Sequence, residues 1–305
     1  MKAYVRGSAQ NQEVKLTEVG ISKVQKNEVL IKVHAFGVGI HDRYFIPMDA
    51  NFPYVIGSEG AGVIEEVDNS VTDFKKGDRV IFSTALQPQG GSWAEYAVAR
   101  SSTLIQMPAE MSFEEAASLP IAGKTALECM RELDLSKGDK LFISGASGAI
   151  GTFVIQLASK KGAVVSASAS EKNHSYMKSL GAGKTVDYKA SDWKEQIVQW
   201  SEGGVDAALA IQPGTGIDGI EVVKDNGELI TVSGDSQHMN AVRGIAVRQM
   251  GHDMAAHQKM IELVQEIAVG KINVVIEKQY SFDEALDALQ KAETRHARGK
   301  LVVTV

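Results

Sequence analysis

The chain has 305 residues, 44% of them hydrophobic and 23% charged, with a formal net charge of −6. This length suffices for two domains that each bury a core, and the composition is ordinary for a globular protein. The acidic total and the absence of a Lys/Arg cluster argue against a nucleic-acid surface, and no apolar run is long enough to span a membrane. The single cysteine, Cys129, and an N-terminus without an apolar signal core predict a cytoplasmic protein.

Short β-like segments separated by glycines make up the first 120 residues. They lie at residues 2–5, 28–35, 62–67, 78–82 and 93–99. This pattern predicts a compact, partly barrel-like β domain. A helix is expected over 112–118, where Ser112 is a suitable N-cap and Glu115 completes a capping box.

Residues 140–151, K-L-F-I-S-G-A-S-G-A-I-G, are the most informative stretch of the chain. An apolar run ends in Gly145, and a helix is expected over 150–161. A strand that turns into a helix offers backbone N–H groups and the positive end of the helix dipole to an anion. Gly145 permits the tight turn, Gly148 lets backbone approach a pyrophosphate, and Gly151 lets the helix pack close to the strand. The turn therefore predicts a dinucleotide site formed by Gly145, Ser147, Gly148, Ala149, Ile150 and Gly151.

Strands and helices alternate beyond this turn. Strands are expected at 164–169, 185–187, 205–211 and 228–232, and helices at 173–180 and 193–200. Gly162 suits the C-cap of the first helix, and residues 244–249 read as a last edge strand. The alternation predicts a parallel, doubly wound sheet. Later pieces, with helices at 253–269 and 282–292 and strands at 274–277 and 301–305, resemble the first domain more than the second.

Six motifs in a fixed order carry a resemblance to a known family. They are V-H-A-F-G-V-G-I-H-D at 33–42, V-I-G-S-E-G-A-G-V-I at 55–64, K-G-D-R-V at 76–80, G-S-W-A-E-Y-A-V at 91–98, L-P-I-A-G-K-T-A at 119–126 and H-A-R-G-K-L-V-V-T-V at 296–305. The chain resembles the medium-chain dehydrogenase/reductase superfamily, most closely its zinc-independent, zeta-crystallin-like quinone oxidoreductase branch. The resemblance implies an α/β fold class. It also implies that a Rossmann doubly wound parallel sheet, residues 121–253, is inserted after a GroES-like, partly open β-barrel domain, residues 1–120, which residues 254–305 complete.

Two departures from the family concern zinc. Zinc-dependent members hold a catalytic zinc with a cysteine in the first motif and a histidine in the second, where this chain has Gly39 and Ser58. Only Glu59 of that set is kept, while His34 and His41 stand at a spacing of no known zinc motif. We therefore expect no metal. Without a Lewis acid, delivery of hydride from NADPH to a quinone or other conjugated carbonyl is easier than alcohol oxidation.

The resemblance places three candidate catalytic residues, Asp42, Tyr44 and Glu59, near the substrate. Tyr44 could stack on or hydrogen-bond to a planar acceptor, or simply pack within its loop. We favour a structural hydrogen-bond acceptor for Asp42 over acid–base work, and Glu59 could satisfy buried donors. Gly39 replaces an asparagine that is usual in quinone reductases, which leaves the identity of the acceptor open.

The end of the second strand bears on the choice of cofactor. NAD-preferring sites place an acidic residue there, ~20 residues beyond the glycine turn, where this chain has Ser170. Ser170 and Lys172 could meet a 2′-phosphate, and Tyr188 matches a tyrosine beside that phosphate in NADPH-dependent relatives. The sequence therefore favours NADPH, although Lys172 could be a solvated side chain and a one-residue shift would place Glu171 at the ribose. The resemblance adds Thr125, Ile211, Ser233, Gly234, Arg298 and Lys300 as cofactor contacts, the last two being alternatively surface charges.

Other interpretations stay open. Relatives pair through the edge strand at 244–249, which predicts a homodimer unless the C-terminal helix covers that edge. An enoyl-thioester reductase of this superfamily would use a tyrosine several residues beyond Asp42, where the alignment gives Ala50. A non-catalytic NADPH-binding protein, such as a sensor or a crystallin, would keep the same glycine turn.

Overall fold

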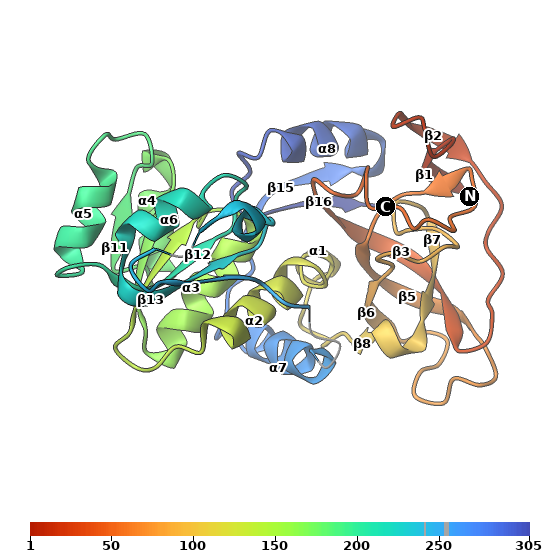
Figure 1. Ribbon diagram of the computed structural model, residues 1–305. Coiled ribbons are helices and arrows are strands. Elements are labelled where there is room, and N and C mark those ends of the chain that lie inside the picture. The colour runs from red at the N-terminus through yellow and green to blue at the C-terminus, as the bar shows by residue number, and fades with distance from the viewer. Residues whose placement is uncertain (241, 253–255) are drawn as a thin grey trace. The chain divides into compact units, whose positions relative to one another are not determined.

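The computed structural model describes residues 1–240, 242–252 and 256–305, and its chain divides into two compact units (Figure 1). Unit 1 comprises Met1–Ile121, Met260–Lys271 and Ile276–Val305. Unit 2 comprises Ala122–Lys259 and Ile272–Val275. The expected domain boundary between residues 253 and 254, and the start of the helix expected over 253–269, lie outside the described residues.

Unit 1 contains two β-sheets. Its strands are β1 (Lys2–Arg6), β2 (Val14–Glu18), β3 (Glu28–Val38), β4 (Tyr54–Val55), β5 (Glu59–Val67), β6 (Arg79–Ser83), β7 (Tyr96–Arg100), β8 (Ile105–Gln106), β15 (Ile276–Ser281) and β16 (Lys300–Thr304). The smaller sheet has the order β2-β1-β4, and the larger β15-β16-β3-β5-β6-β8, with β7 also paired to β3. The last strand, β16, therefore lies inside the larger sheet, parallel to β15 and antiparallel to β3. The predicted partly open β fold is confirmed.

An aromatic core joins the two ends of the chain within unit 1. Trp93 is fully buried and stacks on Phe36, with ring centroids 5.0 Å apart. Tyr4 meets Trp93 edge-on at 5.9 Å, and its hydroxyl donates to the Phe282 carbonyl at 2.8 Å. Such pairs add stability beyond the area that they bury. The core of unit 1 therefore needs both the first strand and the segment near residue 282.

The helices of unit 1 follow the expected pattern. They are α1 (Phe113–Ala117), α8 (Ala285–Glu293) and the part of α7 (His257–Ala268) from Met260 onward. Ser112 caps α1, and its capping box with Glu115 is confirmed, because each side chain bonds the other's backbone N–H. This box satisfies two donors that a helix start otherwise leaves free.

Unit 2 contains a six-stranded parallel sheet (Figure 1). Its strands are β9 (Lys140–Ser144), β10 (Val164–Ser168), β11 (Lys184–Val186), β12 (Val205–Ala210), β13 (Val223–Thr231) and β14 (Ala246–Gln249), and its helices are α2 (Ala122–Leu133), α3 (Ala149–Lys161), α4 (His174–Ser179), α5 (Trp193–Trp200) and α6 (Gly216–Val222). The strand order β11-β10-β9-β12-β13-β14 reverses direction between β9 and β12. This is the doubly wound order 3-2-1-4-5-6, in which ligands bind at the carboxyl ends of the strands around the reversal. The predicted doubly wound sheet is confirmed.

Some elements differ from the expectation. Strands β2, β4 and β8 and helices α2 and α6 were not predicted, and β13 begins at Val223 rather than at residue 228. Helix α6 contains two glycines and two isoleucines, which lower helix propensity. Strand β14 is at the end of the sheet order, as expected for 244–249, and dimerisation through it stays a prediction.

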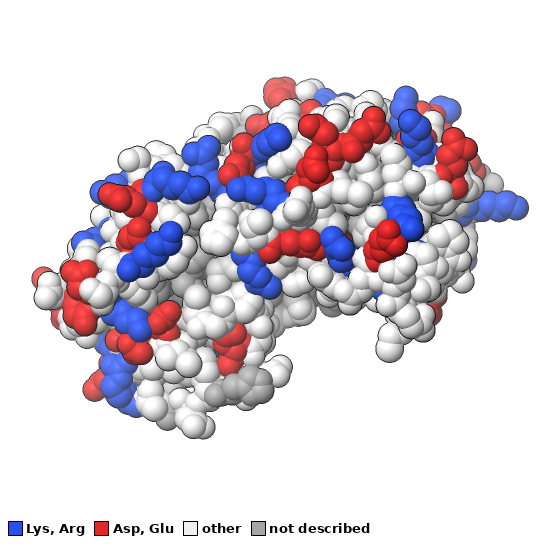
Figure 2. Space-filling model, turned by 90° about the horizontal axis from the view of Figure 1, so that it is seen from above, with Lys and Arg blue, Asp and Glu red and all other residues white. Residues whose placement is uncertain are grey.

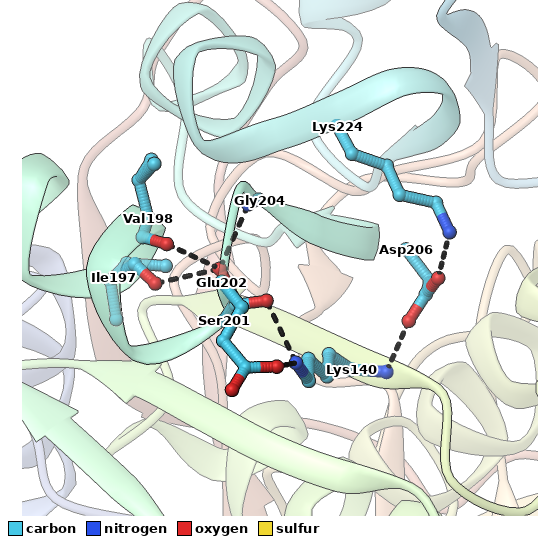
Figure 3. A network of polar contacts seen from close by, with 8 residues as sticks. All are labelled: Lys140, Ile197, Val198, Ser201, Glu202, Gly204, Asp206 and Lys224. Carbon is cyan, nitrogen blue, oxygen red and sulfur yellow. Dashed lines mark hydrogen bonds and ion pairs between the residues drawn. The ribbon is translucent and has the colours of Figure 1, made fainter.

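A polar network ties the amino ends of β9 and β12 together (Figure 3). Asp206 accepts the backbone N–H of Lys140 at 2.6 Å and pairs with Lys224. The ammonium of Lys140 donates to the Ser201 carbonyl at 2.7 Å. Burial raises the pKa of Asp206, but the bonds from Lys140 and Lys224 outweigh burial and hold that pKa below its ordinary value. This end of the sheet is therefore fastened by its own side chains, whereas ligands of such folds bind at the opposite, carboxyl end.

The surface charge and the helices bear on two expectations from the composition, that the protein has no nucleic-acid surface and no membrane-spanning segment. On the face drawn in Figure 2, Lys/Arg and Asp/Glu side chains are interspersed in small groups. A nucleic-acid surface would instead gather basic side chains along one face. Among the described residues, no helix combines the length and apolar character that crossing a membrane requires.

Candidate cofactor and substrate site

Asp42 is buried in the turn that follows β3, with 4% of its surface exposed. One carboxylate oxygen accepts the backbone N–H of Gly39 at 2.8 Å, and the other accepts the Ser58 hydroxyl at 3.0 Å. Burial raises the pKa of Asp42 to about 6, while the Lys300 charge and these hydrogen bonds act to lower it. The geometry is that of a structural acceptor, and a carboxyl with this pKa can also hold a proton near neutral pH.

Glu59 and Lys300 form a buried ion pair beside Asp42. Glu59 starts β5, Lys300 starts β16, and they are 2% and 6% exposed. The second carboxylate oxygen of Glu59 accepts the N–H of Ile121 at 2.8 Å. Gly37 leaves room for the pair, since a Cβ there would lie 2.6 Å from Glu59 Oε1 and 2.7 Å from Lys300 Cε. The interpretation of Lys300 as a surface charge is therefore wrong, and the structure brings Asp42, Glu59 and Lys300 together.

Arg298 is placed differently from Lys300. Its side chain is exposed, and its backbone N–H donates to Glu277 at 2.9 Å. An exposed position in unit 1 is compatible with either role that the sequence suggested.

Tyr44 lies on an exposed loop that is fastened at its neighbour. Tyr44 is 51% exposed, which is compatible with both roles that the sequence left open. Arg43 Nε lies 2.8 Å from the Glu293 carboxylate, and the buried Arg6 donates to the Arg43 carbonyl at 3.0 Å. A fixed loop that presents an exposed phenol can offer a planar surface to a flat molecule.

The glycine turn stands between β9 and α3, at the reversal of the strand order. Gly145 has φ +69°, and a Cβ there would lie 2.7 Å from Gln212 Cγ. A Cβ on Gly148, the N-cap of α3, would meet only the Gly145 carbonyl oxygen, at 3.4 Å. A Cβ on Gly151 would lie 2.4 Å from the Ala146 carbonyl oxygen, so α3 needs glycine there to lie this close to the turn. The residues present fit a pyrophosphate held by the first turn of α3.

The rest of the turn is supported from α4. Ala149 and Ile150 begin α3, and the carbonyl of Ser147 accepts the Tyr176 hydroxyl at 3.2 Å. The sequence did not single out Tyr176, because a bond that spans 29 residues leaves no local pattern.

Ser170, Lys172 and Tyr188 lie at the carboxyl ends of β10 and β11. Ser168 at the end of β10 is in register with Ser144 at the end of β9, so this segment and the glycine turn share one edge. Lys172 is exposed, as is Glu171, and Tyr188 is 43% exposed. Asp187 accepts the backbone N–H groups of Glu171 at 3.3 Å and of Lys189 at 2.9 Å, which fixes the start of this segment.

The remaining candidates stand near the other half of the same edge. Ile211 follows β12, Ser233 and Gly234 follow β13, and Thr125 lies near the start of α2. Two residues that sequence reasoning missed, Asp235 and Gln249, hydrogen-bond the backbone of these loops. The position of Asp235 just beyond a strand's carboxyl end was a usable signal, because binding residues gather there.

Two family matches cover separate parts of the chain. Residues 25–109 match the alcohol dehydrogenase GroES-like domain, and residues 180–303 match the zinc-binding dehydrogenase family. The first match lies within unit 1, and the second begins in unit 2 and ends in unit 1.

The second match is to a zinc-binding family, but the residues at the expected zinc position do not fit a zinc ion. Gly39 has no side chain, the Ser58 hydroxyl donates to Asp42, and Glu59 is paired with Lys300. Zinc needs three or four N, S or O ligands around it, and the ammonium of Lys300 stands where it would repel a cation. Among residues 1–240, 242–252 and 256–305, no group of three His, Cys, Asp or Glu side chains could hold a metal ion.

Whole-chain comparisons agree with one another. The chain is 30% identical to the chloroplast envelope quinone oxidoreductase homolog of Arabidopsis thaliana, across 94% of this chain and 92% of that protein. It is 29% identical to the chloroplastic NADPH-dependent alkenal/one oxidoreductase of the same plant, across 99% and 79%. The solved quinone oxidoreductase of Coxiella burnetii superposes with a TM-score of 0.88 at 28% identity, across 100% and 99%. The chain therefore belongs to the medium-chain dehydrogenase/reductase superfamily, in its quinone oxidoreductase branch.

Proposed function

We propose that this protein is an NADPH-dependent reductase that transfers hydride to a quinone or another conjugated carbonyl. The observation that carries the proposal is the glycine turn at the reversal of a complete doubly wound sheet, in a chain similar along its length to a quinone oxidoreductase homolog. The similarity to an NADPH-dependent alkenal/one oxidoreductase supports the class of acceptor and the cofactor.

The chemistry divides between the cofactor, the acceptor and the protein. A bound nicotinamide nucleotide would supply the hydride. The backbone N–H groups at the start of α3 would hold its pyrophosphate, because Gly148 leaves that space open. A quinone or enone spreads the incoming negative charge over its own π system, so the protein needs no Lewis acid. No step therefore depends on the zinc ligands that Gly39 and Ser58 replace.

Unit 1 supplies groups suited to an electron-poor, planar acceptor. The exposed ring of Tyr44 offers a surface for stacking and a hydroxyl for a hydrogen bond. Asp42 accepts the Ser58 hydroxyl, and because burial raises its pKa to about 6, its carboxylate takes up a proton as the pH falls toward that value. A proton is needed after hydride transfer, and Ser58 can relay it because a hydroxyl both accepts and donates.

The first test is turnover. The purified protein is expected to oxidise NADPH in the presence of a simple quinone or an activated enone, to oxidise simple alcohols poorly, and to keep its activity in a chelator. Consumption of NADPH with enoyl thioesters alone would favour an enoyl-thioester reductase. Binding of NADPH without turnover on any of these acceptors would favour a non-catalytic binding protein.

The second test concerns the 2′-phosphate. Lys172→Ala is expected to weaken the binding of NADPH about tenfold or more and to leave the binding of NADH unchanged. The reason is that a hydrogen bond to a charged group is worth roughly 1.5–3 kcal/mol. Ser170→Asp is expected to shift preference toward NADH. Titration of both cofactors against each variant measures this, with Lys178→Ala as the matched control, since Lys178 is an exposed lysine on nearby α4. A wild type that prefers NADH would instead assign the ribose position to Glu171.

A further inference from the structure

Asp235 lies on the loop after β13, and its side chain binds the backbone of the loop after β12. One oxygen of its carboxylate accepts two backbone N–H groups, from Gly214 at 2.8 Å and from Gly216 at 3.0 Å. These N–H groups stand just before and at the start of α6, where a helix leaves its donors without partners of its own. Asp235 therefore fixes 212–216 from a point 19 to 21 residues further along the chain.

The two glycines make this contact possible. Gly214 has φ +83°, a backbone conformation that favours glycine. A Cβ on Gly216 would lie 2.7 Å from Met239 Sδ and 3.1 Å from Asp235 Cβ, so a side chain there would push the aspartate away. The sequence P-G-T-G at 213–216 is thus shaped around the Asp235 carboxylate.

Gln249, at the carboxyl end of β14, holds the loop that carries Asp235. Its amide oxygen accepts the Thr231 hydroxyl at 2.7 Å and the N–H of Gly234 at 3.1 Å. Its amide nitrogen donates to the Val232 carbonyl at 2.9 Å. The Gln249 amide therefore fixes residues 231–234, immediately before Asp235, by three hydrogen bonds.

The same chain of contacts reaches the glycine turn. The Thr215 hydroxyl donates to the Gln212 carbonyl at 2.7 Å, so Ser144, 2.7 Å away, donates to Thr215 in turn. Ser144 is the last residue of β9, and the next residue, Gly145, lacks the Cβ that would strike Gln212. Hydrogen bonds and close packing thus run along the carboxyl edge from β14 to the first residue of the pyrophosphate turn.

We propose that Asp235, held by Gln249, is a positioning residue for the nicotinamide half of the cofactor, an inference that rests on the proposed function. In the order 3-2-1-4-5-6 one mononucleotide lies on each side of the reversal. The ribose position after β10 takes the adenine side, so the loops after β12 and β13 face the nicotinamide side. Asp235 and Gln249 order these two loops before the cofactor arrives, which reduces the entropy lost on binding.

The experiment compares NADPH with 2′,5′-ADP, which carries only the adenine half. Asp235→Ala is expected to raise the dissociation constant for NADPH about tenfold, as the loss of a charge-assisted hydrogen bond would, and to leave 2′,5′-ADP within about twofold. Gln249→Ala should act in the same direction. Asp235→Asn should restore NADPH binding, because its amide oxygen can still accept both N–H groups. Asp225→Ala is the matched control, since Asp225 is an exposed partner of Arg243 in the same unit.

The outcomes separate this inference from the proposed function. If a folded Asp235→Ala variant lost equal affinity for NADPH and for 2′,5′-ADP, Asp235 would have a general structural role and the inference would be overturned. Unchanged affinity for both ligands would overturn it as well. An Asp235→Asn variant as weak as Asp235→Ala would overturn the hydrogen-bond explanation. A wild type that binds neither NADPH nor NADH would instead overturn the proposed function itself. Thermal unfolding of each variant shows whether unit 2 is folded.

Discussion

Lys300→Met is expected to lower the free energy of unfolding of unit 1 by about 3–5 kcal/mol, the usual cost of breaking a buried ion pair from one side. The Glu59 carboxylate, 2% exposed, would lose its counter-charge and keep only the N–H of Ile121. Water cannot readily replace the ammonium, because the surroundings are packed tightly enough to forbid a Cβ on Gly37. Urea unfolding followed by Trp93 fluorescence measures the effect, with Trp193 and Trp200 of unit 2 replaced by phenylalanine.

Two further variants identify the cause. Adding Glu59→Gln to Lys300→Met should recover most of the loss, because the amide is neutral and still accepts from Ile121. Lys75→Met removes a lysine that is 83% exposed and paired with Asp78, so it should change stability by no more than about 0.5 kcal/mol. A double variant as unstable as Lys300→Met alone would show that lost packing, not the unpaired charge, is responsible.

Asp42→Asn is expected to change stability in a way that depends on pH. Burial raises the pKa of Asp42 from its ordinary value of 3.8 to about 6 in the folded protein. The contribution of Asp42 to wild-type stability is therefore fully present below about pH 4 and is lost as the pH rises through about 6. A pKa difference of about two units corresponds to about 3 kcal/mol. Between pH 4 and pH 8, the free energy of unfolding of the variant should therefore rise by that much relative to wild type.

Asp68 provides a control of opposite sign. Hydrogen bonds from the Ser70 side chain and backbone lower the pKa of Asp68, so its contribution is present above the ordinary value and is lost as the pH falls. Asp68→Asn should therefore have a lower free energy of unfolding than wild type at neutral pH, and the difference should shrink in acid. Urea unfolding at several pH values compares both variants. A constant difference between Asp42→Asn and wild type across this range would contradict the raised pKa.

Much of unit 2 could be predicted because its signals are local. Helix α5 matches its expected bounds, and Gly162 has the left-handed conformation of a C-cap, with φ +90°. The capping box at 112–115 was visible because its two members stand three residues apart. Helix α2 was missed because residues 119–126 were interpreted as a family motif rather than as the start of a helix.

The contacts that organise the candidate site could not be predicted in the same way. Glu59 and Lys300 are 241 residues apart, and a lysine is usually exposed. Only the insertion of β16 between β15 and β3 buries it. Asp235 was missed for a related reason, since Gly214 and Gly216 lie 21 and 19 residues away and glycines do not identify the side chain that they accommodate. Asp42 was found through the family motif, but its pKa depends on burial, which a single sequence does not state.

The position of β16 within the larger sheet has a consequence for synthesis of the chain on the ribosome. Domains tend to fold as they emerge, in order from the N-terminus. Residues 122–259, nearly all of unit 2, emerge while unit 1 still lacks β15 and β16. During that time Glu59 has no counter-ion and β3 has a free edge where β16 will lie. The nascent unit 1 is thus an open sheet with an unneutralised acid, and β16 closes the edge and neutralises the acid in one step.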